Sequence, residues 1–201
     1  MRIFKNIMTV IVCCAILVSI GSAWYSTKSQ NNSGGHSGIY TLTQEDKEWV
    51  IDKFGDCPDV ETLLIRVRDY AVENFKYDHN YSEYFQNFQF RKFITTNLGV
   101  CFHYASFLKV VFLEWAEFTN TDLQVYVVDI YYKGNFWGAR HSYSVVKIPS
   151  ADGLADKNYY IDITSAVCRA AKGEEPLGFE MFETDIETYA SMYGEVVINY
   201  H

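Results

Sequence analysis

The stretch "NLGVCFHYASFLKVVFLEW", residues 97–115, places a cysteine at the point where a loop turns into a long apolar segment. From Cys101 onward, apolar side chains recur at helical spacing on one side: Tyr104, Ala105, Leu108, Val111, Phe112 and Trp115. Because residues three and four apart share a helix face, this spacing predicts a core helix that begins near Cys101. A cysteine in such a run is usually a small buried hydrophobic residue, so packing is the simplest interpretation of this thiol.

Two helices are predicted before this stretch. Residues 43–54 begin with Thr43, a typical N-cap, and continue with acidic residues in the first turn. A second helix follows Pro58, with Asp59 as its cap. Residues 81–97 are rich in aromatic side chains, and their pattern does not decide their form.

Three strand-like runs follow the stretch, separated by polar turns: residues 123–132, 141–148 and 158–164. Consecutive strands joined by short polar loops form an antiparallel sheet. The sequence therefore predicts an α+β fold, in which N-terminal helices precede the Cys101 helix and this helix packs on an antiparallel β-sheet. A short helix over residues 183–194 and a strand over residues 195–200 complete the expected fold.

A second interpretation of Cys101, as a nucleophile, requires a group that favours its thiolate. A cysteine in the first turn of a helix is close to the positive end of the helix dipole, which has that effect. Histidine is the usual partner, and His141 is the best placed because it begins a strand. The other four histidines lie in a polar segment, in a loop, on the wrong side of the same helix or at the chain end: His36, His79, His103 and His201.

Asp162 stands between Ile161 and Ile163 in the last of the three strand-like runs. A carboxylate is depleted in strands and costly to bury without a partner. Taken alone, an aspartate on the solvated side of the sheet is the simplest interpretation. If the strands of His141 and Asp162 are hairpin neighbours, however, the carboxylate reaches the imidazole and orients it.

Three motifs in this order carry a family resemblance: Cys101 in "GVCFHYASFLKVVF", His141 in "ARHSYSVVKI" and Asp162 in "NYYIDITSA". The set resembles the transglutaminase-like superfamily, whose members have a papain-like Cys-His-Asp triad with the cysteine at a helix start. The segment "YAVENFKYD", residues 70–78, is also similar to the segment that precedes the cysteine in many bacterial members. The resemblance covers residues 59–164, about half of the chain.

The resemblance implies an enzyme with Cys101 as nucleophile, His141 as general base and acid, and Asp162 as the residue that orients the imidazole. It implies acyl transfer through a cysteine thioester on amide bonds of peptides or proteins, and the acceptor, water or an amine, stays open. No cysteine and histidine pairs stand at metal-ligand spacing, so neither a metal nor another cofactor is expected.

The composition limits the partners. The chain has 201 residues and a formal net charge of -8. A surface of that sign disfavours nucleic acid, which is bound by basic surfaces. The length suffices for one sizeable core.

The N-terminus predicts export. Basic Arg2 and Lys5 precede an apolar run that ends in small residues, so residues 1–23 are predicted to be a signal peptide or an uncleaved anchor. Residues 24–39 are then a flexible polar linker, and residues 40–201 form the transglutaminase-like domain. The expected location is secreted or extracytoplasmic, with membrane contact only through the N-terminal segment.

The sequence leaves the pairing of the cysteines and the function of the domain open. Without the leader the chain keeps Cys57, Cys101 and Cys168, and either the first and last form a disulfide or all three are free. The domain could also be a catalytically silent binding module that grips a peptide or glycan with four aromatic residues: Phe85, Phe88, Phe90 and Phe93. In a third, weaker interpretation, Cys101 itself is in a structural disulfide.

Overall fold

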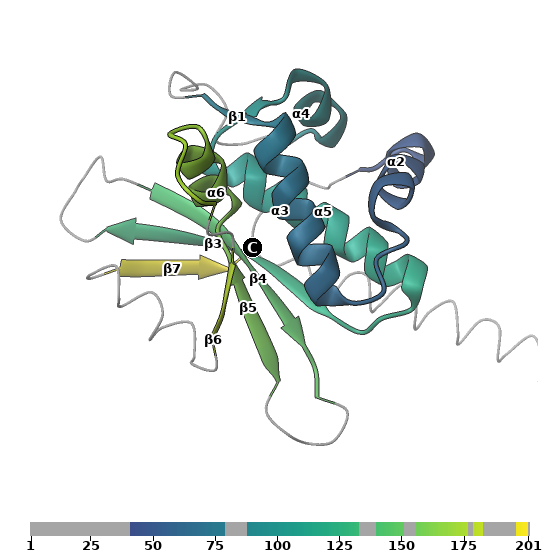
Figure 1. Ribbon diagram of the computed structural model, residues 1–201. Helices are drawn as coiled ribbons and strands as arrows, with labels where there is room; N and C mark the ends of the chain where they lie inside the picture. The colour runs from purple at the N-terminus through teal and green to yellow at the C-terminus, as the bar shows by residue number, and fades with distance from the viewer. Residues whose placement is uncertain are drawn as a thin grey trace, which may run out of the picture. The chain divides into compact units, whose positions relative to one another are not determined.

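The computed structural model describes residues 41–78, 88–132, 140–150, 156–176, 179–182 and 196–200, and Figure 1 shows how their elements are arranged. The helices are α2 (Gln44–Phe54), α3 (Val60–Asn74), α4 (Phe90–Thr96), α5 (Cys101–Thr119) and α6 (Ile163–Ala170). The strands are β1 (Lys76–Tyr77), β2 (Leu98–Gly99), β3 (Gln124–Tyr132), β4 (Arg140–Ile148), β5 (Lys157–Ile161), β6 (Phe179–Phe182) and β7 (Val196–Tyr200). All belong to one compact unit, Gly38–His201. The predicted mixture of helices and an antiparallel sheet is confirmed.

The larger sheet has the strand order β6-β5-β4-β3-β7, and every neighbouring pair is antiparallel. The predicted strands correspond to β3, β4, β5 and β7, whereas β6 was not expected. Helix α5 packs on β3 and β4, and Figure 1 shows α2, α3 and α5 together on one side of the sheet. Two registers matter below: Asp129 of β3 lies opposite Ser142 of β4, and Ser144 lies opposite Ile161 of β5.

Strand β5 ends earlier than the sequence predicts. It stops at Ile161, and Asp162 is the N-cap of α6. The prediction of a strand over residues 158–164 was therefore wrong at its end, and Cys168 lies in α6. The sequence does not show this switch from strand to helix, because the residues on both sides of Asp162 are apolar. Ile161 is buried in the sheet and Ile163 is buried in the helix.

Both predicted N-caps of the first helices are confirmed. At α2, Thr43 Oγ1 accepts a hydrogen bond from the Asp46 N–H, and the Asp46 carboxylate accepts one from the Thr43 N–H at 3.0 Å. At α3, Asp59 Oδ1 accepts from the Thr62 N–H at 2.7 Å. These bonds satisfy main-chain donors that have no partner inside the helix.

Helix α5 is buried on several faces, whereas the predicted apolar stripe covers only one. Ser106 and Phe107 lie off that stripe and are 0% exposed, as is Tyr104 on it. The helix contacts α2, α4 and α6 as well as the sheet. Aromatic rings fill the space around it, with the Phe107 centroid 5.0 Å from Phe75 and 5.7 Å from Phe93. The helix is therefore the centre of the core.

The described part of the aromatic segment before α5, residues 88–97, belongs largely to the core. Helix α4 gives a form to residues 90–96, and its Phe90 and Phe93 are 5% and 2% exposed. Phe88 is partly buried against the same core, and Phe85 lies outside the described residues. Two of the four aromatic residues suggested for ligand binding are thus committed to packing.

The three cysteines of the described residues are all free. The structure therefore contains neither a Cys57–Cys168 bridge nor a disulfide at Cys101. Cys57 is buried, and its carbonyl accepts a hydrogen bond from Trp115 Nε1 at 3.3 Å.

Residues 1–23, 24–39 and 183–194 lie outside the described residues, so the predicted leader, linker and C-terminal helix stay predictions. In the part of the chain that the structure describes, no helix has both the length and the apolar character to cross a membrane.

Candidate active site

The N-terminus of α5 carries Cys101, and the segment before it fixes where this helix begins. Helix α4 ends at Thr96, its C-cap Asn97 is left-handed with φ 58, and β2 then pairs in parallel with β1. Gly99 is tightly enclosed: a Cβ atom there would lie 2.7 Å from Phe93 Cε2 and 2.9 Å from His103 Cβ. Only a residue without a side chain fits this approach, so Gly99 allows Cys101 to begin the helix where it does.

His141 and Asp162 come together at the end of the β4–β5 pair. His141 Nε2 and Asp162 Oδ2 are 2.8 Å apart, and both side chains are 26% exposed. The hairpin relationship that the sequence required for this contact is present, since β4 and β5 are antiparallel neighbours. The other carboxylate oxygen, Asp162 Oδ1, accepts the Ser165 N–H at 3.0 Å. This second bond holds the carboxylate in place.

Cys101 is hydrogen-bonded to His141, so the structure brings the three predicted site residues together. Asp162 takes Nε2 of the imidazole, which leaves Nδ1 for the sulfur. Cys101 also receives a hydrogen bond from the Ser142 main-chain N–H, and the Ser142 hydroxyl is within hydrogen-bonding reach of the sulfur. Successive side chains of a strand point to opposite faces, so a sulfur that meets both His141 and Ser142 lies against the edge of β4. That edge is open because β5 ends opposite Ser144.

The electrostatics favour an ion pair between Cys101 and His141. Burial raises the pKa of the Cys101 thiol, but the hydrogen bond and charge of His141 and the donors of Ser142 outweigh it and lower this pKa below its ordinary value. Burial likewise lowers the pKa of His141, while hydrogen bonds to Asp162 and Cys101 raise it to about 10. A thiolate beside an imidazolium is the activated form of a cysteine nucleophile.

Ser142 lies against the thiol and Asp129 lies against Ser142, and the sequence singled out neither residue. Ser142 Oγ donates a hydrogen bond to Asp129 Oδ1 at 2.5 Å, and both residues are buried. The signal for Asp129 resembles that for Asp162, because it is a carboxylate in an otherwise apolar strand. Ser142 had no signal beyond its place next to His141.

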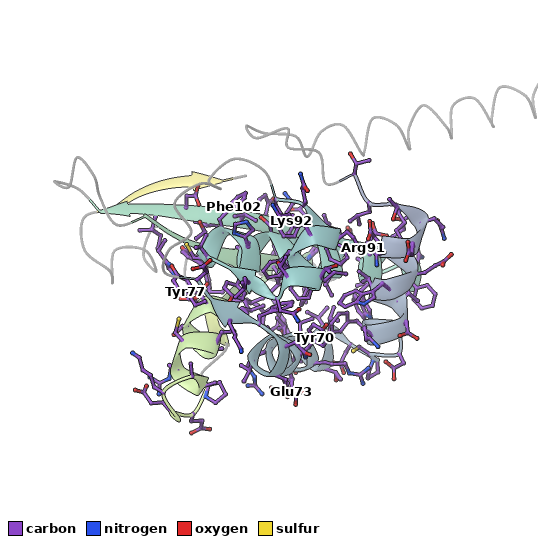
Figure 2. The ribbon with its side chains drawn as sticks, turned by 90° about the horizontal axis from the view of Figure 1, so that it is seen from above. Tyr70, Glu73, Tyr77, Arg91, Lys92 and Phe102 are labelled. Carbon is purple, nitrogen blue, oxygen red and sulfur yellow. The ribbon has the colours of Figure 1, made fainter. Side chains whose placement is uncertain are left out.

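Tyr77 and Cys168 complete the surroundings of the site. Tyr77 pairs with Gly99 in the β1–β2 register, and its ring is nearly parallel to that of Tyr104, at 10° and 6.4 Å between centroids. Burial raises the pKa of Tyr77, as do the nearby charges of Cys101, Cys168 and Asp162. Figure 2 shows Tyr77 on the side of the molecule where α6 lies, far from Arg91.

His103, the histidine closest in sequence to Cys101, belongs to the core. It is 4% exposed, its ring stacks on Phe93 with centroids 6.0 Å apart, and its Nδ1 accepts the Val100 N–H at 3.4 Å. Burial and the charge of Lys92 lower its pKa to about 4. In the described ranges, no three His, Cys, Asp or Glu side chains are grouped so that they could hold a metal ion.

Comparison with known proteins yields a distant likeness. No protein-family model and no curated protein matches the sequence. One similar solved structure is the crystal structure of a protein from Cytophaga hutchinsonii, provisionally described as a cysteine protease, with 15% identity and a TM-score of 0.45. The likeness covers 81% of this chain and 50% of that one, so this chain spans half the length of that structure.

Proposed function

We propose that this chain is a thiol enzyme of the transglutaminase-like type that acts on amide bonds of peptides or proteins. One observation carries the proposal: Cys101 at the start of α5 is hydrogen-bonded to His141, whose Nε2 lies 2.8 Å from Asp162 Oδ2. A nucleophile, a base and a group that orients the base are the parts that covalent acyl transfer needs.

In the proposed reaction, the Cys101 thiolate attacks the amide carbonyl carbon and forms a tetrahedral intermediate. The imidazolium of His141 gives its proton to the departing amine, which leaves a thioester on the sulfur. Asp162 keeps the ring oriented and stabilises its positive charge. The main-chain N–H of Cys101, in the first turn of α5, is the candidate donor to the developing oxyanion.

The second half of the proposed reaction decides its product. When water attacks the thioester, with His141 now as the base, the result is hydrolysis. When an amine attacks instead, the result is a new amide bond, as in transglutamination. The proposal covers both outcomes, and it places the enzyme outside the cytoplasm on the strength of the N-terminal sequence.

The alternative of a silent binding module loses its main support. It relied on an exposed aromatic cluster, and Phe90 and Phe93 of that cluster are buried against α5. An inactive site would also have no need of an arrangement that lowers the pKa of Cys101.

The test is the pH dependence of iodoacetamide alkylation at each cysteine, followed by mass spectrometry of the full chain. Cys101 is expected to react well below pH 8, about where ordinary thiols are still protonated. Cys168 is the internal control, because burial and the charge of Asp162 raise its pKa. His141→Ala should remove the early reactivity of Cys101 only. A Cys101 that is indifferent to His141 would exclude the proposed enzyme.

If Cys101 is reactive in the alkylation experiment, the next experiment tests whether it forms an acyl-enzyme. Denaturing the protein rapidly in the presence of peptide amides or esters should trap an acyl group on Cys101, seen as a mass increase of the peptide that contains it. The same trapping with added primary amine separates transfer from hydrolysis.

A further inference from the structure

Asp129 and Ser142 form a buried pair beside Cys101. They lie opposite each other in the β3–β4 register, so their side chains project from the same face of the sheet. The Ser142 hydroxyl donates to Asp129 Oδ1 at 2.5 Å, and the two residues are 1% and 0% exposed. Two residues further along β4, the Ser144 hydroxyl donates to the Ala105 carbonyl at 3.1 Å. This face of β4 is therefore the one that α5 covers.

Ser142 also touches the sulfur of Cys101, through both its main-chain N–H and its hydroxyl. A serine hydroxyl has one proton and two lone pairs. While that proton points at Asp129, the hydroxyl can accept a hydrogen bond from the Cys101 thiol but cannot donate one to a thiolate. The Asp129 carboxylate and the Cys101 sulfur thus compete for a single donor.

We propose that Asp129 is a positioning residue that sets the protonation of Cys101 through Ser142. In the thiol form of Cys101, Ser142 donates to Asp129 and accepts from the Cys101 S–H. When the thiol proton passes to His141 Nδ1, the Ser142 hydroxyl turns and donates to the thiolate. One S–H bond breaks, one N–H bond forms, and Ser142 keeps its own proton throughout. The inference rests on the proposed function, because it concerns the activation of the same thiol.

The direction of the effect follows from the strength of the competing acceptor. A carboxylate is a stronger hydrogen-bond acceptor than a neutral amide, so Asp129 holds the Ser142 proton away from the thiolate and opposes activation. In the described residues, the titratable groups that interact with Cys101 are His141, Tyr77 and Cys168, and Asp162 contacts His141. These residues are the same in the wild type and in the Asp129 variants, so a difference in alkylation between the two comes from the change at Asp129.

The test is a double-mutant cycle on the alkylation of Cys101 in the full chain. Asp129→Asn should speed alkylation about threefold on the acid limb of the pH profile, because the hydroxyl is released to the thiolate. Ser142→Ala should slow it by about the same factor, since the thiolate then loses the hydroxyl donor and keeps only the main-chain N–H of Ser142 and the imidazolium of His141. The double variant should match Ser142→Ala. Asp156→Asn is the matched control, because Asp156 pairs with Lys147 far along β4 and is exposed.

Two outcomes would overturn the inference: Asp129→Asn leaves the profile unchanged, or it shifts the profile equally with and without Ser142. If an Asp129 or Ser142 variant does not fold, the inference can still be tested on the protein in which both residues are unchanged. The carbon resonance of the Asp129 carboxyl should change at the pH where Cys101 ionises and lose that step in Cys101→Ala, and the absence of a step contradicts the inference. If His141→Ala also leaves Cys101 unaffected, the proposed function itself fails; otherwise only the role of Asp129 does.

Discussion

Asp162 and His141 are joined at 2.8 Å through one carboxylate oxygen, while the other oxygen of Asp162 caps α6 at the Ser165 N–H. The carboxylate is therefore fixed by the helix before it acts on the imidazole. Because each oxygen has its own partner, substitutions can separate the two roles.

Asp162→Asn should keep the cap and lose the charge. Asparagine and aspartate are about equally good N-caps, so the free energy of unfolding in urea should stay within about 0.5 kcal/mol of the wild type. The pKa of His141 should fall from about 10, and alkylation of Cys101 at neutral pH should slow by about tenfold. Asp162→Ala should lose both roles and about 1 kcal/mol of stability. Equal stability of the two variants would show that the cap contributes nothing.

The activity should have a bell-shaped pH profile. The acid limb follows the thiol of Cys101, whose pKa lies below its ordinary value, and the alkaline limb follows the imidazolium of His141, near pH 10. Activity needs both charges, so it rises as Cys101 ionises and falls as His141 loses its proton. The measurement is kcat/KM against pH on a peptide amide. An acid limb at the ordinary thiol pKa contradicts the ion pair.

The stability of the fold should decline in mild acid because of His103. Its pKa is about 4 in the folded protein against an ordinary 6.5, so between these values the unfolded state binds more protons. The contribution is complete above about pH 6.5 and is lost as the pH falls toward 4, by up to about 3 kcal/mol. His103→Gln is the control, because glutamine at this position accepts the Val100 N–H without titrating. A decline of the same size in His103→Gln assigns it to other groups.

Gly99→Ala should damage both the fold and the site. The new Cβ would meet Phe93 and His103 at less than normal contact distance, and shifting them should cost about 1–3 kcal/mol. The start of α5 should move with them, which slows alkylation of Cys101. Gly173→Ala is the comparison, because Gly173 has φ +74 but open space around it. It should lower stability modestly and leave Cys101 unchanged, as urea unfolding and alkylation will show.

The three candidate site residues were found because their motifs, taken in order, resemble a known family, and each also stands out from its surroundings. Cys101 begins an apolar helix, His141 begins a strand, and Asp162 is a carboxylate between isoleucines. The antiparallel sheet followed from short polar connections between β3, β4 and β5. These features depend on residues that are close together in the chain, so they can be recognised in the sequence alone.

What the sequence did not predict depends on contacts between distant segments. The pairing of Asp129 with Ser142 appears only once the β3–β4 register is known, and Ser142 on its own is an ordinary strand residue. The pairing of β1 with β2 likewise joins short segments that lack strand character of their own. The end of β5 was missed because Ile161 and Ile163 are both buried, one in a sheet and one in a helix.

The candidate site is assembled from segments that are distant in the sequence, and this has a consequence for the order in which it forms during folding. His141 meets Asp162 only after β4 and β5 have paired, and Cys101 meets His141 only after α5 has docked on that pair. A nascent chain that has left the ribosome as far as α5 therefore carries Cys101 as an ordinary, weakly nucleophilic thiol. If Cys101 is the nucleophile that we propose, its activation waits until these segments have assembled.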